Sequence, residues 1–158
     1  MRSWVIYSFI AFFMLLGLGA CGFEPIYASG SQVGKGLQNI KLAAPTNREA
    51  YIFARSFEER LGRNSGASTT LRYNISIYDQ GLDLRDVSIA QKIGSVSYQL
   101  IDEADGDVIA SGKVEAFTSY SSEGNLSVAS QYDASERLLI ILADRVISKL
   151  AAQLPVGH

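Results

Sequence analysis

The sequence contains one cysteine, and the residues before it give its thiol a specific chemical use. Cys21 directly follows Leu18-Gly19-Ala20, at the end of an apolar segment that runs from Trp4 to Leu18. A single positive charge, Arg2, precedes that segment. A positive residue, a short apolar core and small residues before a cut are the layout of a secretory signal. We therefore interpret Cys21 as the residue at which an exported chain is cleaved and lipidated.

Leu, two small residues and Cys resemble the lipobox of bacterial lipoproteins. There the thiol takes a diacylglycerol, the chain is cut before Cys, and the new N-terminus receives a fatty acid such as palmitate. The alternatives are a transmembrane anchor, a secretory signal with an incidental cysteine, and a buried core segment. A spanning helix needs about 20 apolar residues, and this run is shorter and ends in small residues. Gly22, rather than Asp, resembles lipoproteins that are passed on to the outer membrane.

The sequence offers few residues that could act in catalysis. The only histidine, His158, is the last residue and follows Pro155, where no rigid surroundings would orient it. There is no Gly-x-Ser-x-Gly motif, and Gly34-Lys35-Gly36 lacks the Ser or Thr of a phosphate-binding loop. The acidic residues 102–107 lack the ligand spacing of a calcium loop and are typical of a tight turn. We therefore expect a protein that is not an enzyme and that has no cofactor or metal.

The composition indicates one ordinary domain. The chain has 158 residues, and about 140 remain after the signal, enough for one buried core. The net charge is −2 and 19% of the residues are charged, which argues against a nucleic-acid partner. We divide the chain into a signal peptide (1–20), a lipidated N-terminus and linker (21–36), a single α+β periplasmic domain (37–154) and a tail (155–158).

The first half of the domain reads as a strand, a helix and a second strand. Leu37 to Leu42 is a short strand candidate after a flexible, Gly- and Ser-rich stretch at residues 28–36. Thr46-Asn47-Arg48-Glu49 fits a capping box, so a helix should follow, and Gly62 or residues 64–66 should end it. The residues from Leu71 to Ile77 then alternate between apolar and polar, which predicts a strand with one wet face.

The second half reads as a polar loop at residues 79–86, a hairpin and a long helix. In the strand candidate from Val87 to Ile101 the apolar residues change phase, and we expect a bulge at Gly94. Asp105-Gly106 is a strong signal for a tight turn into a returning strand. Residues 121–129 read as a loop, and residues 130–154 as an amphipathic helix that Pro155 ends.

This order of strand, helix, three strands and helix predicts an α+β fold. We expect a two-layer sandwich in which two helices cover a four-stranded, mostly antiparallel sheet.

Four stretches carry a resemblance that spans nearly the whole chain: Cys21 to Tyr27, Phe57 to Leu61, Tyr98-Gln99-Leu100 and Leu142 to Leu150. Together with the order of elements they resemble the LptE family of lipopolysaccharide-assembly lipoproteins, in its alphaproteobacterial form. The resemblance implies a lipoprotein anchored in the outer membrane of a Gram-negative envelope, with its domain in the periplasm or inside the lumen of a barrel. It further implies a plug and assembly partner of the LptD barrel, which assists the insertion of lipopolysaccharide into the outer leaflet.

Two other functions remain open at this point. One is an accessory lipoprotein of an envelope phospholipid ABC transport system, which can share the anchor and the helix-on-sheet build. The other is an enzyme or a small-ligand carrier, which would need a concave polar pocket with a perturbed ionisable group. The sequence offers no candidate for such a group.

The candidate contact residues follow from side-chain chemistry and from the resemblance. Arg85 and Lys92 are candidate lipopolysaccharide contacts, because phosphate recognition needs cationic side chains. The candidate partner contacts are all apolar or aromatic, a type enriched at interfaces: Phe23, Ile26, Tyr27, Tyr78, Tyr120 and Tyr132. For the last three tyrosines the alternative is that they fill sheet edges and helix joints.

Overall fold

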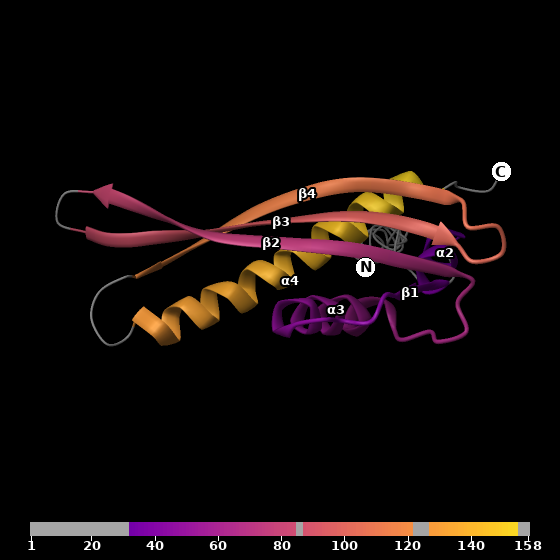
Figure 1. Ribbon diagram of the computed structural model, residues 1–158, viewed down its shortest axis with the longest axis horizontal. Helices are drawn as coiled ribbons and strands as arrows, with labels where there is room; N and C mark the ends of the chain where they lie inside the picture. Colours follow the sequence, from indigo (N-terminus) through magenta and orange to yellow (C-terminus); the bar gives the residue numbers. More distant parts are fainter. Residues whose placement is uncertain (1–31, 85–86, 122–126, 155–158) are drawn as a thin grey trace, which may run out of the picture.

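A four-stranded sheet forms one layer of the fold, and the helices pack against one of its faces (Figure 1). This computed structural model describes residues 32–84, 87–121 and 127–154. Its elements, in chain order, are α2 (Gln32–Gln38), β1 (Ile40–Leu42), α3 (Arg48–Leu61), β2 (Thr69–Leu84), β3 (Val87–Asp102), β4 (Val108–Ser121) and α4 (Ser127–Gln153).

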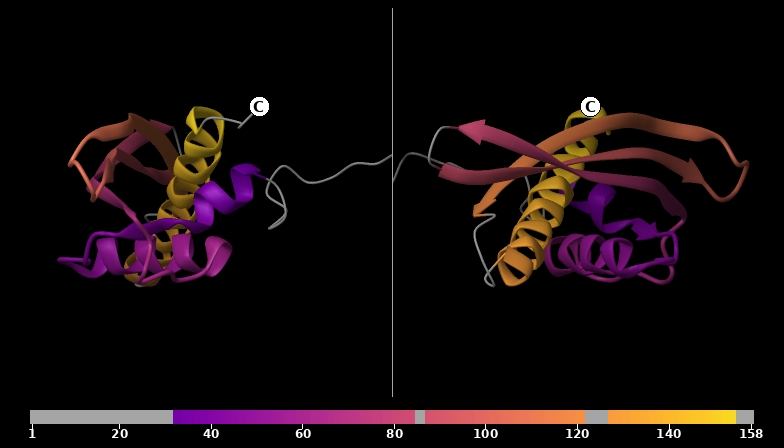
Figure 2. Two further views of the ribbon diagram at one scale, coloured as in Figure 1. Left: turned by 90° about the vertical axis from the view of Figure 1, so that its right-hand side faces the viewer. Right: turned by 60° about the vertical axis from the view of Figure 1, so that its left-hand side comes forward.

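The strands lie in sequence order, β1-β2-β3-β4. β1 pairs parallel with the first three residues of β2, and the other two ladders are antiparallel. α4 crosses diagonally beneath the sheet, with α3 beside it under β2, and the opposite face of the sheet carries no helix (Figures 1 and 2). The expected α+β sandwich is therefore confirmed, with α2 as an additional helix.

The core lies between the sheet and a row of leucines on α4. Leu138, Leu139, Leu142, Val146 and Leu150 have no exposed surface, at the three- and four-residue spacing of one helix face. The even-numbered residues of β3 and β4 meet them from the sheet, among them Val96 and Leu100. Phe53 and Phe57 of α3 close one side of this core.

α3 is capped one residue later than predicted. The N-cap is Asn47, whose Oδ1 accepts from the backbone N–H of Ala50 at 2.7 Å, and the helix starts at Arg48. Asn is as good an N-cap as Thr, and from this position its side chain reaches the third helical amide. Gly62 ends the helix as predicted, with φ +85° and a hydrogen bond from its N–H to the carbonyl of Glu58.

The predicted bulge at Gly94 is wrong. Gly94 pairs regularly with Ile77 and Ala116 on its two neighbours, and the register shift of the β3–β4 ladder lies between Leu100 and Ile101. A Cβ on Gly94 would meet Leu138 Cδ2 at 2.9 Å and Leu142 Cδ1 at 3.0 Å. The glycine therefore allows α4 to approach the sheet, which is the other common reason for a glycine in a strand.

Three other boundaries differ from the prediction. Residues 32–38 form a helix in place of a linker and the start of a strand, because Val33 and Leu37 are buried against the core. β2 continues to Leu84, through the segment predicted as a polar loop, because it pairs with β3 along its whole length. α4 starts at Ser127, three residues earlier than expected. The β3–β4 hairpin is confirmed, with Gly106 at φ +80° in its turn.

The close approach at Gly94 can be tested with a matched pair of glycines. Gly94→Val should lower the free energy of unfolding by about 1–3 kcal/mol, because its side chain must displace the leucines of α4. Gly81→Val is the control in β2, where nothing lies within 4 Å of an added Cβ. It should be neutral or slightly stabilising, since Val favours strands. Urea denaturation followed by circular dichroism measures both, and equal effects would contradict this role of Gly94.

Candidate interaction surfaces

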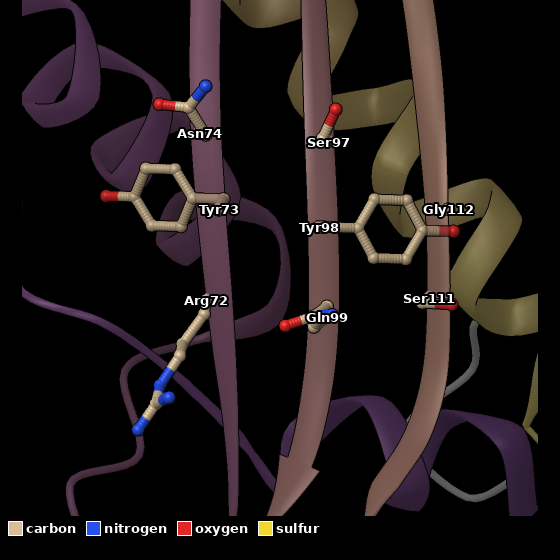
Figure 3. Close-up of a pocket in the computed structure, with 8 residues that line it drawn as sticks. All are labelled: Arg72, Tyr73, Asn74, Ser97, Tyr98, Gln99, Ser111 and Gly112. Atoms are coloured by element: carbon tan, nitrogen blue, oxygen red, sulfur yellow. The ribbon is translucent and has the colours of Figure 1, made fainter.

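The uncovered face of the sheet has a shallow depression of about 540 Å³ across β2, β3 and β4. Its lining side chains include Arg72 and Asn74 from β2, Ser97 and Gln99 from β3, and Ser111 from β4 (Figure 3). The backbone positions them, because alternate residues of a strand point to the same face. With one cation among neutral amides and hydroxyls, the depression suits a polar, weakly charged partner surface.

Two tyrosines, Tyr73 and Tyr98, lie next to the depression, and their hydroxyl groups contact other elements of the fold. Tyr98 is 2% exposed and donates from its hydroxyl to Gln153 Oε1 of α4 at 2.9 Å. Its ring passes Gly112, where an added Cβ would lie 2.8 Å from the hydroxyl oxygen. Burial raises the pKa of both Tyr73 and Tyr98 above the usual range of a phenol. Both hydroxyls are therefore neutral donors that connect the sheet to the helices, since that of Tyr73 donates to the carbonyl of Ala50 on α3 at 3.4 Å.

An apolar row crosses the same open face farther along the strands. Tyr78, Ile93 and Phe117 are directly paired across β2, β3 and β4, and Tyr78 and Phe117 are 57% and 63% exposed. Such cross-strand neighbours lie about 5 Å apart and form one continuous surface. Tyr78 is thus accessible, as a partner contact requires. Phe117 was missed, although its type and its place in an alternating strand mark it as an exposed aromatic.

Lys92 lies on the opposite, covered face of the sheet. Its side chain is 8% exposed and its Nζ is 2.7 Å from Oδ1 of Asp79, the residue paired with it on β2. Tyr120 is also on this face, donates from its hydroxyl to Asp79 Oδ1 at 3.0 Å, and has its ring 5.5 Å from Lys92 Nζ. Lys92 is therefore already paired, and a phosphate could reach its ammonium only if this ion pair opened.

Tyr120 lies at the contact between the sheet and α4. It is 8% exposed and packs with Ala90 of β3 and with Ala134 of α4. Burial, together with the hydrogen bond to Asp79 and the charge of that carboxylate, raises the pKa of the Tyr120 hydroxyl above its usual range. The ring thus offers little surface to a partner in this arrangement.

Tyr132 is exposed on the N-terminal part of α4. Its ring is 56% exposed and carries the guanidinium of Arg48 at 4.7 Å from its centroid. A cation over an aromatic face is worth about 0.5–1 kcal/mol at an exposed site. This contact links the start of α3 to α4. Of the three candidate tyrosines, Tyr78 thus lies on the open face of the sheet, whereas Tyr120 and Tyr132 lie on the side that carries the helices.

The remaining candidate residues lie outside the described part of the chain. These are Cys21, Phe23, Ile26, Tyr27 and Arg85. Within the described ranges, no helix is both long and apolar enough to cross a membrane. In the same ranges no three His, Cys, Asp or Glu side chains gather as metal ligands would.

Comparison with solved structures identifies the fold. A candidate lipoprotein from Caulobacter crescentus is 23% identical and superposes with a TM-score of 0.64, over 77% of this chain and 94% of that chain. The domain therefore has the same fold as that protein. A minor lipoprotein from Acinetobacter baumannii (16% identity, TM-score 0.57, 75% of this chain and 93% of that one) and an uncharacterized lipoprotein B from Nitrosomonas europaea (11%, 0.55, 72% and 81%) share it. No protein-family model and no curated protein matches the sequence.

The ion pair beneath the sheet should respond asymmetrically to substitution. Asp79→Ala leaves the buried ammonium of Lys92 without its carboxylate and should lower the free energy of unfolding by about 1–3 kcal/mol, the cost of an unsatisfied buried group. Lys92→Met removes the buried charge and leaves a half-exposed carboxylate that water can solvate, so its cost should be clearly smaller. Chemical denaturation of the two variants measures the difference. A larger loss for Lys92→Met would show that the pair is not organised around a buried cation.

Proposed function

We propose that the protein is a non-enzymatic outer-membrane lipoprotein of the lipopolysaccharide transport machinery. In this role it is the plug and assembly partner of an LptD-like barrel and assists the insertion of lipopolysaccharide into the outer leaflet. The observation that carries the proposal is the match of the domain to nearly the whole length of a candidate bacterial lipoprotein. The lipobox-like residues before Cys21 agree with it, because they would attach such a domain to a membrane by its first residue.

The chemistry of the open face supports a protein partner. A plug must match a water-lined barrel interior. This face combines a polar depression with the apolar row of Tyr78, Ile93 and Phe117, in which both aromatic residues are exposed. Aromatic residues supply much contact area at low cost in side-chain entropy, and they are enriched at the centres of interfaces. The net charge of −2 gives no strong field that would favour a polyanion instead.

Direct contact with lipopolysaccharide phosphates needs an accessible cation. Lys92 is engaged by Asp79, so a phosphate must displace that carboxylate to reach the ammonium. Arg72 is the exposed cation of the polar depression and offers an alternative position for such a contact.

Recovery of the partner tests the proposal directly. A C-terminally tagged chain, purified from detergent-solubilised envelopes, should retain a large barrel protein in about equal amount. Cys21→Ala should shift the chain from the membrane to the soluble fraction, because a triacylated cysteine holds far more firmly than a single acyl chain. Unchanged membrane fractionation of this variant would exclude lipidation, and recovery of an inner-membrane transporter would favour the phospholipid-transport alternative.

The aromatic row should matter for binding more than for folding. Replacing both Tyr78 and Phe117 by Ser should reduce recovery of the barrel at least tenfold, while the free energy of unfolding changes by less than about 1 kcal/mol, because both rings are more than half exposed. Tyr51→Ser is the matched control, since Tyr51 is 58% exposed on α3. Equal recovery from the double variant and the control would show that this row is not part of the interface.

A further inference from the structure

The two edges of the sheet differ in how their main-chain groups are used. Along β4, four outward carbonyls accept hydrogen bonds from side chains of α4. The donors and acceptors are Arg137 to Ser119, Arg145 to Glu115, Lys149 to Lys113, and Gln153 to Ser111. The donors are four or eight residues apart, so they share one side of the helix. This edge is capped by α4 and cannot readily accept another strand.

The edge of β2 is open for most of its length. β1 pairs only with residues 69–71, and the N–H of Ala43 donates to the carbonyl of Leu71 at 2.9 Å. Because main-chain groups of alternate residues point to the same side of an antiparallel strand, Tyr73, Ile75, Ile77 and Asp79 present theirs on that same edge. Across residues 32–84, 87–121 and 127–154, these edge-facing groups have no hydrogen-bond partner.

Natural sheets protect an open edge with proline, lysine, a bulge or a covering element. Residues 72–80 contain no proline and no lysine, their two charged residues (Arg72 and Asp79) lie near the ends of the segment, and their pairing with β3 is unbroken. The same sheet is protected on its β4 side, so the open β2 margin, at the opposite side of the sheet in Figure 1, is a local exception. An exposed row of paired donors and acceptors is the template that strand addition uses.

We propose that the edge of β2 from Tyr73 to Asp79 binds an extended strand of a partner protein, which adds to the sheet as a fifth strand. The side chains define its chemistry. Ile75 and Ile77 are only half-buried on the covered face, so the added strand needs apolar residues at alternate positions there. On the open face it lies beside Asn74, Ser76 and Tyr78, so its other residues are polar. The partner segment is thus amphipathic with a two-residue period, and it has no proline at the pairing positions.

A second copy of this chain fits poorly when the two edges pair symmetrically about Ser76, the middle of this segment. Antiparallel pairing of two β2 edges about Ser76 would place residues 81–83 of one copy opposite residues 69–71 of the other. Those residues already pair with β1, so β1 would occupy the space that the second copy needs. The inference goes beyond the proposed function, because it concerns a main-chain site on one edge and holds for any partner that supplies such a strand.

Photocrosslinking in cells that make the full lipidated chain tests this site. A benzoylphenylalanine is placed in turn at positions 74, 76 and 78 of β2, and at position 97 of β3 as the control on the same face. Strand addition predicts crosslinks from the three β2 positions to one segment of one partner protein, with the crosslinked residue advancing by two for each step. Position 97 lines the polar depression and can contact another part of the same partner, but it should give at most a tenth of the yield to this one segment, because the middle strand does not border the edge.

A proline at the edge gives the matched chemical test. Ile77→Pro removes an N–H that faces away from β3, so the ladder is kept while the edge loses one donor. It should reduce the crosslinks at least tenfold, whereas Ile77→Val, which keeps the N–H, should retain them. Ile77→Lys is the second blocking variant, because inward-pointing lysine is a natural protection of edges. Circular dichroism checks that each variant is folded.

Five results would overturn the proposal. Four of them are crosslinks to residues 22–31 of the same chain, crosslinks to a second copy of the chain, equal yields to the same partner segment from positions 74 and 97, and crosslinks that persist in both folded blocking variants. Absence of any crosslink from the three β2 positions would do the same. A barrel recovered in the purification described above, but without this ladder of crosslinks, would refute the strand site and leave the proposed function intact.

Discussion

The contact between α4 and the middle of the sheet is the constraint on which the rest of the structure depends. The helix can lie this close because Gly94 has no side chain, so Leu138 and Leu142 occupy the space that a Cβ would need. From this position α4 meets α3 through the hydrogen bond from Arg60 to Asp144. Side chains on the other side of α4 donate hydrogen bonds to the outward-facing carbonyls of β4. One helix therefore sets the spacing of the two layers, the place of α3 and the state of one sheet edge.

Much of the fold follows from periodicity in the sequence, and the errors have physical reasons. α4, α3 and the hairpin carry long repeats of 3.6 or 2 residues, and all three were predicted. α2 was missed because Gly34 and Gly36 disfavour a helix, whereas burial of Val33 and Leu37 stabilises it. β2 was cut short because Asp79, Gln80 and Gly81 are poor strand formers when considered alone. Pairing with β3 overrides that local preference.

The surfaces were harder to predict than the elements, because they depend on register. Tyr78 and Phe117 are 39 positions apart in the numbering and meet only through Ile93 between them. Lys92 has the side chain of a typical surface residue, and its burial depends on Asp79 being its partner on the next strand. A sequence shows which residues share a face of one strand. It does not show which residue of the neighbouring strand lies opposite, and that choice decides whether a cation is free or paired.

The capping of β4 by Arg145, Lys149 and Gln153 also limits how the sheet can assemble. A sheet with two open edges can take a strand on one side and offer another on the opposite side, and this is how fibrils elongate. In this protein the β4 edge of the sheet is occupied by the protein's own helix, α4. A chain that takes a strand at its β2 edge therefore offers no second edge of its own. The α4 side chains therefore leave the sheet with one open edge, so copies of this chain cannot join head to tail through it.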